Sequence, residues 1–188
     1  MKNRQGSLVK VLTAVVMGLF MVMAFSTLAP AQEAKVLKDA AKMMSDAWKM
    51  FDDGQRLVIK GLEMNNLIAA QAGVQDLMNP GNKTIGSGRD SVLEGAKLFA
   101  QGQKVVMDAS DAKVMKEGVD MLRNGFKIAI GGKETMEKGM AMNDQVAQSK
   151  GIMDKFADGN KIMKDGMATM AQGIKLFMQG NALYQGNK

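Results

Sequence analysis

Cysteine and histidine are both absent from this chain of 188 residues, and only two prolines occur. The lack of cysteine excludes disulfides, thiol catalysis, zinc–thiolate sites and a bacterial lipoprotein anchor. The lack of histidine removes the commonest general base and the commonest metal ligand, and with them the Glu-x-x-His sites of di-iron bundles. No catalytic motif remains. We therefore expect a protein that is not an enzyme and has no cofactor, apart from the soft-metal alternative given below.

Aromatic residues make up only 5% of the chain, and charge of one sign is not concentrated anywhere. Three of the 25 basic residues lie in the first 31 positions, and the others nearly balance the 19 acidic residues. A nucleic-acid-binding surface would show clustered Lys and Arg, so we expect no nucleic-acid partner. Amphipathic helices that bind a membrane surface are usually more basic and richer in Trp and Phe. A membrane partner is therefore not favoured.

The longest apolar run lies close to the N-terminus. Lys2, Arg4 and Lys10 flank its start, the run covers 11–25, and Ala29-Pro30-Ala31 supplies the small residues that a signal peptidase recognises. The run is shorter than the roughly 20 residues of a membrane-spanning helix. We predict a cleaved signal peptide over 1–31, a single helical domain over 32–188, and a periplasmic or extracellular location. An uncleaved N-terminal anchor is the alternative.

Glycine recurs every seven residues through most of the remaining chain, and Ala40 and Ala47 precede the first series in the same rhythm. Seven residues are two helical turns, so each series forms a stripe without side chains on one helix face. A glycine inside a helix costs about 1 kcal/mol relative to alanine, so we expect another helix to pack closely on each stripe. The predicted helix-contact glycines are Gly54, Gly61, Gly88, Gly95, Gly102, Gly118, Gly125, Gly132, Gly139, Gly159, Gly166, Gly173 and Gly180.

The heptad pattern predicts an all-α fold, an antiparallel and coiled-coil-like bundle of three to four long helices. The phase of the pattern shifts near 65–66, 108–110 and 146–151, and each shift marks a candidate helix end. Asn79-Pro80-Gly81-Asn82 is a stronger turn signal, because proline breaks helices. We therefore place the first loop near 79–88, with 65–66 as the alternative. Asp108 and Ser110 are candidate N-caps of the following helix.

The glycine stripes allow three functional interpretations. They can pack helices within one molecule, form a seam between molecules, or leave room for an elongated apolar ligand such as a lipid chain. We expect a non-enzymatic structural or interaction protein, whose partner is another protein or a second copy of this chain bound through the glycine-lined faces. Binding of a lipid or another apolar ligand is an alternative.

Methionine is unusually abundant, with 20 residues in the chain. Met163, Met167 and Met170 are spaced to lie on one side of a helix. Thioethers bind Cu(I) and Ag(I), so a soft-metal binding or sequestration protein is a further alternative. Most methionines nevertheless occupy apolar positions of the heptad, where a flexible side chain that fills the core is the commoner role.

Overall fold

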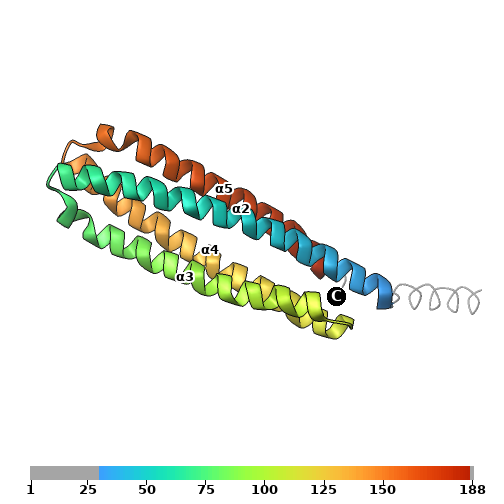
Figure 1. The fold of residues 1–188 in the computed structure, drawn as a ribbon. Coiled ribbons are helices and arrows are strands. Elements are labelled where there is room, and N and C mark those ends of the chain that lie inside the picture. Colours follow the sequence, from blue (N-terminus) through green and yellow to red (C-terminus); the bar gives the residue numbers. More distant parts are fainter. Residues whose placement is uncertain (1–29, 187–188) are drawn as a thin grey trace, which may run out of the picture.

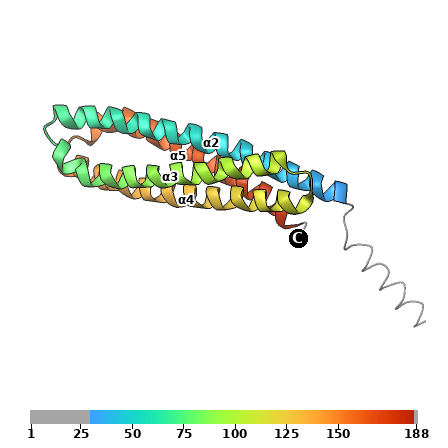
Figure 2. The same ribbon diagram turned by 60° about the horizontal axis from the view of Figure 1, so that its bottom comes forward.

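The computed structural model describes residues 30–186, so the predicted signal peptide lies almost entirely outside the described residues. Four long helices are present: α2 (Pro30–Gln71), α3 (Gln75–Asp108), α4 (Ala112–Ser149) and α5 (Ala157–Gln185), with a short 3₁₀ helix, η1 (Met153–Phe156), before α5. Successive long helices run antiparallel, and 30–186 contain no strand (Figures 1 and 2). The predicted all-α antiparallel bundle is confirmed. None of the helices in this range has the length and apolarity needed to cross a membrane.

Two pairs of helices pack much more closely than the others, α2 with α5 and α3 with α4 (Figure 1). A Cβ atom added to Gly54 would lie 2.5 Å from the carbonyl oxygen of Gly166, and one added to Gly88 would lie 2.5 Å from that of Gly132. The backbones can approach this closely only because no side chain stands between them. The remaining contacts pair Gly61 with Gly159, Gly81 with Gly139, Gly95 with Gly125, Gly102 with Gly118, Gly173 with Ala47, and Gly180 with Ala40.

Each glycine of the close contacts lies against the residue that follows its partner by four positions, and at most of them the side chain of that residue covers the glycine. Val58, four residues after Gly54, lies over Gly166, and Met170, four residues after Gly166, lies over Gly54. This exchange repeats along both pairs and has the form of knobs-into-holes packing. The glycine stripes are therefore covered by helices of the same chain, and a second molecule could reach them only by displacing a helix.

The predicted loop near 79–88 is wrong, because the chain turns at 72–74 and α3 continues through Pro80. Pro80 is the sixth residue of α3, so its missing N–H deprives only the carbonyl of Asp76, in the exposed first turn, of its helical partner. Packing of the following glycines against α4 holds the helix together beyond this point. The alternative break at 65–66 is also wrong, since both residues lie inside α2.

The helix ends use recognisable capping chemistry. The 72–74 turn contains Gly73 at φ +67°, and Val74 N–H donates to the Ala69 carbonyl at 2.9 Å, as in a Schellman motif. The side chain of Asp111, not of Asp108 or Ser110, caps α4 by accepting a hydrogen bond from Val114 N–H at 3.0 Å. The two later phase shifts therefore located helix ends to within a few residues.

The chain contains an internal repeat that the heptad pattern had concealed. Residues 31–108 align without gaps with the residues 78 positions later, and 25 of the 78 positions are identical. The hairpin α2–α3 thus corresponds to the hairpin α4–α5, and Gly151, at φ +65°, repeats the turn of Gly73. Equivalent positions make equivalent contacts, so the two hairpins are related by a pseudo-twofold axis along the bundle.

An aromatic layer joins the two hairpins at this axis. Trp48 stacks on Phe99 with ring centroids 4.6 Å apart, and the equivalent pair, Phe126 and Phe177, stacks at 4.0 Å. Trp48 and Phe126, which occupy equivalent positions, meet each other edge-on at 5.6 Å. Such aromatic pairs add about 0.5–1.5 kcal/mol each beyond the area they bury. This layer is the apolar junction between the two closely packed helix pairs.

A layer of asparagines joins all four helices towards the 72–74 turn. Asn65 donates to Asn160 at 2.7 Å, and the equivalent Asn143 donates to Asn82 at 2.7 Å. Asn82 and Asn160 in turn donate to Asn66 and Asp144 at 2.9 and 3.1 Å. The side-chain oxygens of Asn65 and Asn143 lie against Gly159 and Gly81, where a Cβ would collide with them. Because a buried polar layer of this kind pairs in only one register, it fixes the alignment of the helices.

Adjacent glycines of α4 provide a direct test of the close helix contact. A Cβ at Gly132 would meet the α3 backbone, whereas a Cβ at Gly131 meets nothing within 4 Å. We expect Gly132→Ala to lower the free energy of unfolding by about 1–3 kcal/mol through overpacking. Gly131→Ala should raise it by up to about 1 kcal/mol through helix propensity. Urea denaturation followed by circular dichroism measures both, and equal effects would contradict the close contact.

Candidate functional site

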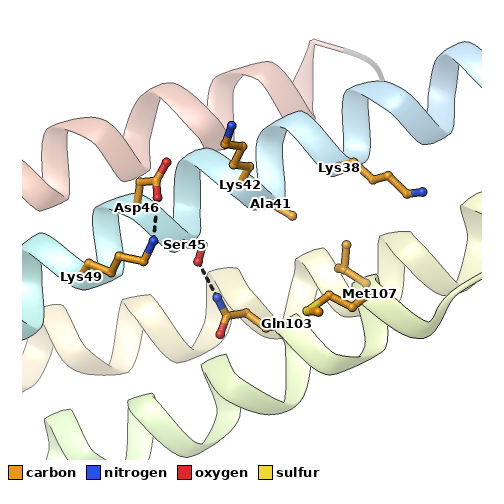
Figure 3. A pocket seen from close by; sticks show the side chains of 9 residues that line it. Lys38, Ala41, Lys42, Ser45, Asp46, Lys49, Gln103 and Met107 are labelled. Carbon is orange, nitrogen blue, oxygen red and sulfur yellow. Dashed lines mark hydrogen bonds and ion pairs between the residues drawn. The ribbon is translucent and has the colours of Figure 1, made fainter.

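A cavity of about 440 Å³ opens between α2 and α3, near the end of the bundle that carries the α3–α4 turn (Figure 3). We call it the α2–α3 cavity. Ala41 and Val106 are buried and form its apolar floor, and Met107 is 81% exposed at its edge. The full lining consists of Lys38, Ala41, Lys42, Ser45, Asp46, Lys49, Gln103, Val106 and Met107.

The polar groups of the cavity lie on its wall and rim. The side-chain amide of Gln103 on α3 donates to the hydroxyl of Ser45 on α2 at 2.5 Å, which ties the two helices together (Figure 3). Lys49 forms an ion pair with Asp46 at 3.1 Å. Lys38 and Lys42 are exposed and have no ion-pair partner within 30–186. The rim therefore has a surplus of positive charge.

Larger side chains fill the equivalent position between α4 and α5. Arg123 stands where the first hairpin has Ser45, and Tyr184 stands where it has Val106. Arg123 donates to Asn181 at 2.6 Å and to Asp120 at 2.8 Å. The Tyr184 hydroxyl donates to Asp120 at 3.0 Å, and the guanidinium lies 5.2 Å from the centre of the tyrosine ring. The two hairpins thus differ at the very place where one of them has a cavity.

Tyr184 is only 2% exposed, and its surroundings stabilise the neutral phenol. Burial raises the pKa of Tyr184 to about 12, aided by the hydrogen bond to Asp120 and the negative charge of that carboxylate, while Arg123 acts in the opposite direction. The neutral hydroxyl can donate to Asp120, whereas a phenolate would repel it. The position between α4 and α5 that corresponds to the cavity is therefore closed by a partly buried network of the Tyr184 phenol, the Asp120 carboxylate and the Arg123 guanidinium.

The methionines predicted as metal ligands lie in or beside the contact between α2 and α5. Met163 lies over Gly61 and Met170 over Gly54, and Met167 is partly buried against the core. Seven helical residues separate Met163 from Met170, about 10 Å along α5. Each covers its own glycine, which accounts for methionine at these positions. Binding of Cu(I) or Ag(I) by the three residues stays a prediction. Residues 30–186 contain no group of three or more Asp or Glu side chains arranged to hold a metal ion.

No family model, curated protein or solved structure matches this chain. The second hairpin is therefore the natural reference for the first. None of the thirteen predicted helix-contact glycines lines the α2–α3 cavity, so the heptad pattern gave no sign of it. Alignment of the two hairpins would have revealed Ser45 and Val106 as small residues opposite Arg123 and Tyr184.

The closed network can be tested through the only tyrosine of the chain. The ordinary pKa of tyrosine is about 10. Because the folded-state pKa is higher, the network contributes stability below pH 10 and loses it as the pH rises towards 12. We expect the near-ultraviolet absorbance of tyrosinate to titrate with a midpoint of about 12. Asp120→Asn should lower this midpoint, and Asp111→Asn should leave it unchanged. A midpoint at the ordinary value would contradict the network.

Proposed function

We propose that this protein is a non-enzymatic exported binding protein that holds one apolar small molecule in the α2–α3 cavity. The observation that favours this function is the difference between the hairpins, because the same position is open in one and filled in the other. The cavity volume of about 440 Å³ falls within the range of about 300–1,000 Å³ typical of small-molecule sites. Its apolar floor and few polar groups are also typical of such sites.

The packing of the bundle supports the proposal, because each of the two helices that form the cavity packs closely on a helix that lies outside the cavity. α2 is joined closely to α5, and α3 is joined closely to α4, while α2 and α3 contact each other much less. The cavity therefore lies between two rigid helix pairs and not within either of them. A ligand could occupy it without disturbing a glycine contact.

A second candidate, a structural or interaction role, is favoured by two exposed leucines beside the 72–74 turn. Leu67 is 66% exposed and Leu77 is 49% exposed. The equivalent residues of the second hairpin are Gln145 and Lys155, both polar. Here too the hairpins differ. The exposed leucines of the first hairpin form the apolar surface that a protein partner or a second copy of the chain would cover.

Ligand binding is tested with N-phenyl-1-naphthylamine, a neutral apolar fluorophore. We expect saturable binding with one site per chain. The combined substitutions Lys42→Asp, Ser45→Arg, Gln103→Asn and Val106→Tyr copy the closed network into the first hairpin, so they should fill the cavity and weaken binding at least roughly tenfold. Fluorescence titration measures both proteins, and circular dichroism verifies that the variant folds.

The reciprocal variant is the matched control. Asp120→Lys, Arg123→Ser, Asn181→Gln and Tyr184→Val copy the open residues into the second hairpin, and the stoichiometry should rise from one towards two. Unsaturable binding, or equal affinity in the parent and the closed variant, would contradict the proposed site.

The second candidate is tested by light scattering over a hundredfold range of protein concentration. A mass that rises with concentration in the parent, and stays monomeric after Leu67→Gln and Leu77→Lys, would establish self-association through the leucines. The matched control carries Leu93→Gln, a change to an equally exposed leucine in the middle of α3. A parent that remains monomeric throughout would exclude self-association through this surface.

A further inference from the structure

The α2–α3 cavity combines an apolar floor with unpaired positive charge, and this combination restricts the ligand. Lys38 and Lys42 are four residues apart on α2 and both line the cavity; in Figure 3 the Lys38 side chain extends along α2, and that of Lys42 extends away from Gln103 and Met107. Lys49 is neutralised by Asp46 at 3.1 Å. The two remaining ammonium groups are available to an acidic group of a bound molecule.

In the second hairpin, where the position is filled, the residues equivalent to Lys38 and Lys42 both have partners within the chain. The residue equivalent to Lys38 is Lys116, which forms an ion pair with Glu33 at 2.5 Å. The residue equivalent to Lys42 is Asp120, which is bonded to Arg123 and Tyr184. Of these two pairs of equivalent residues, only Lys38 and Lys42, beside the open cavity, are both cationic and without an ion pair within 30–186.

The apolar lining matches a chain rather than a compact polar molecule. Ala41 and Val106 offer a floor without polar atoms, and Met107 extends from α3 beside it (Figure 3). Met107 is 81% exposed, and a ligand lying along it would remove this apolar side chain from water. The thioether chain is flexible and adapts to ligands of different shape.

We propose that the α2–α3 cavity binds an anionic amphiphile, a molecule with one acidic head group and a single unbranched hydrocarbon chain. The chain lies on Ala41, Val106 and Met107, and the head group lies between Lys38 and Lys42. This assignment rests on the proposed function, because it names the ligand class of the same cavity. Free fatty acids have this chemistry, and so do anionic lipids at a membrane surface; the cavity volume and its place within the bundle favour a single free molecule.

The experiment compares three ligands with the same chain length, namely dodecanoate, dodecanol and dodecyltrimethylammonium, each below its micellar concentration. Each is used to displace N-phenyl-1-naphthylamine from the full chain. Dodecanoate should bind roughly tenfold more tightly than dodecanol, which is about 1.4 kcal/mol and within what two exposed charge pairs can contribute together. Dodecyltrimethylammonium should bind most weakly. The preference for dodecanoate should decrease as salt is added.

Lysine substitutions then locate the head group. Lys38→Gln combined with Lys42→Gln should weaken dodecanoate binding roughly tenfold and leave dodecanol and N-phenyl-1-naphthylamine unchanged. The matched control, Lys113→Gln with Lys127→Gln, removes the same charge from the second hairpin and should leave dodecanoate affinity unchanged. Equal loss in both double variants would overturn the assignment of the head group.

The outcomes separate this inference from the function on which it rests. If N-phenyl-1-naphthylamine binds but dodecanol competes as well as dodecanoate, the anionic preference is overturned and the cavity remains a binding site. If the fluorophore does not bind, the proposed function itself fails. Sedimentation with phosphatidylglycerol vesicles in the absence of dodecanoate binding would assign the lysines to a membrane surface and overturn the proposal of a free ligand.

Discussion

Backbone contact between paired glycines is the constraint on which the rest of this bundle depends. Gly54 against Gly166 and Gly88 against Gly132 bring two helices together with no side chain between them, and the heptad repeats this contact along both pairs. The distance between the pairs is then set by whatever side chains lie between them. Trp48 and Phe126 fill the middle, and asparagines fill the end near the 72–74 turn. At the other end the residues that face each other from α2 and α3 are small, and the α2–α3 cavity results.

The same contact explains the composition of the chain. A glycine leaves a gap in the surface of its own helix. On the facing helix, the side chain four residues after the partner glycine must fill that gap. Val58 does so with a short branched side chain, whereas Met163 and Met170 do so with flexible thioethers. The cost of glycine in a helix is offset by the dispersion contacts and weak Cα–H···O contacts that close backbones can form. Methionine at these positions thus has the same physical origin as the glycines that it covers.

The sequence predicted those features that depend on local periodicity. The heptad glycines indicated helices and their antiparallel packing, and the phase shifts indicated two of the three turns. Pro80 wrongly indicated a loop, because a proline costs little when the only carbonyl that loses its helical hydrogen bond lies in an exposed first turn. The cavity could not be predicted from periodicity, because Ser45 and Gln103 belong to different helices. Alignment of the two halves of the chain at an offset of 78 residues would have indicated the cavity.

Differences between the two hairpins have more functional meaning than their similarities. Two identical hairpins around a twofold axis would have either two equivalent cavities or none. Here Arg123, Asp120 and Tyr184 seal one position with hydrogen bonds and a ring contact, and the equivalent position stays open. Lys42 stands where the sealed half has Asp120, so the carboxylate that accepts hydrogen bonds from Arg123 and Tyr184 has no counterpart at that position of the open half. An acidic partner from outside the chain is what would restore the balance that Asp120 provides in the sealed half.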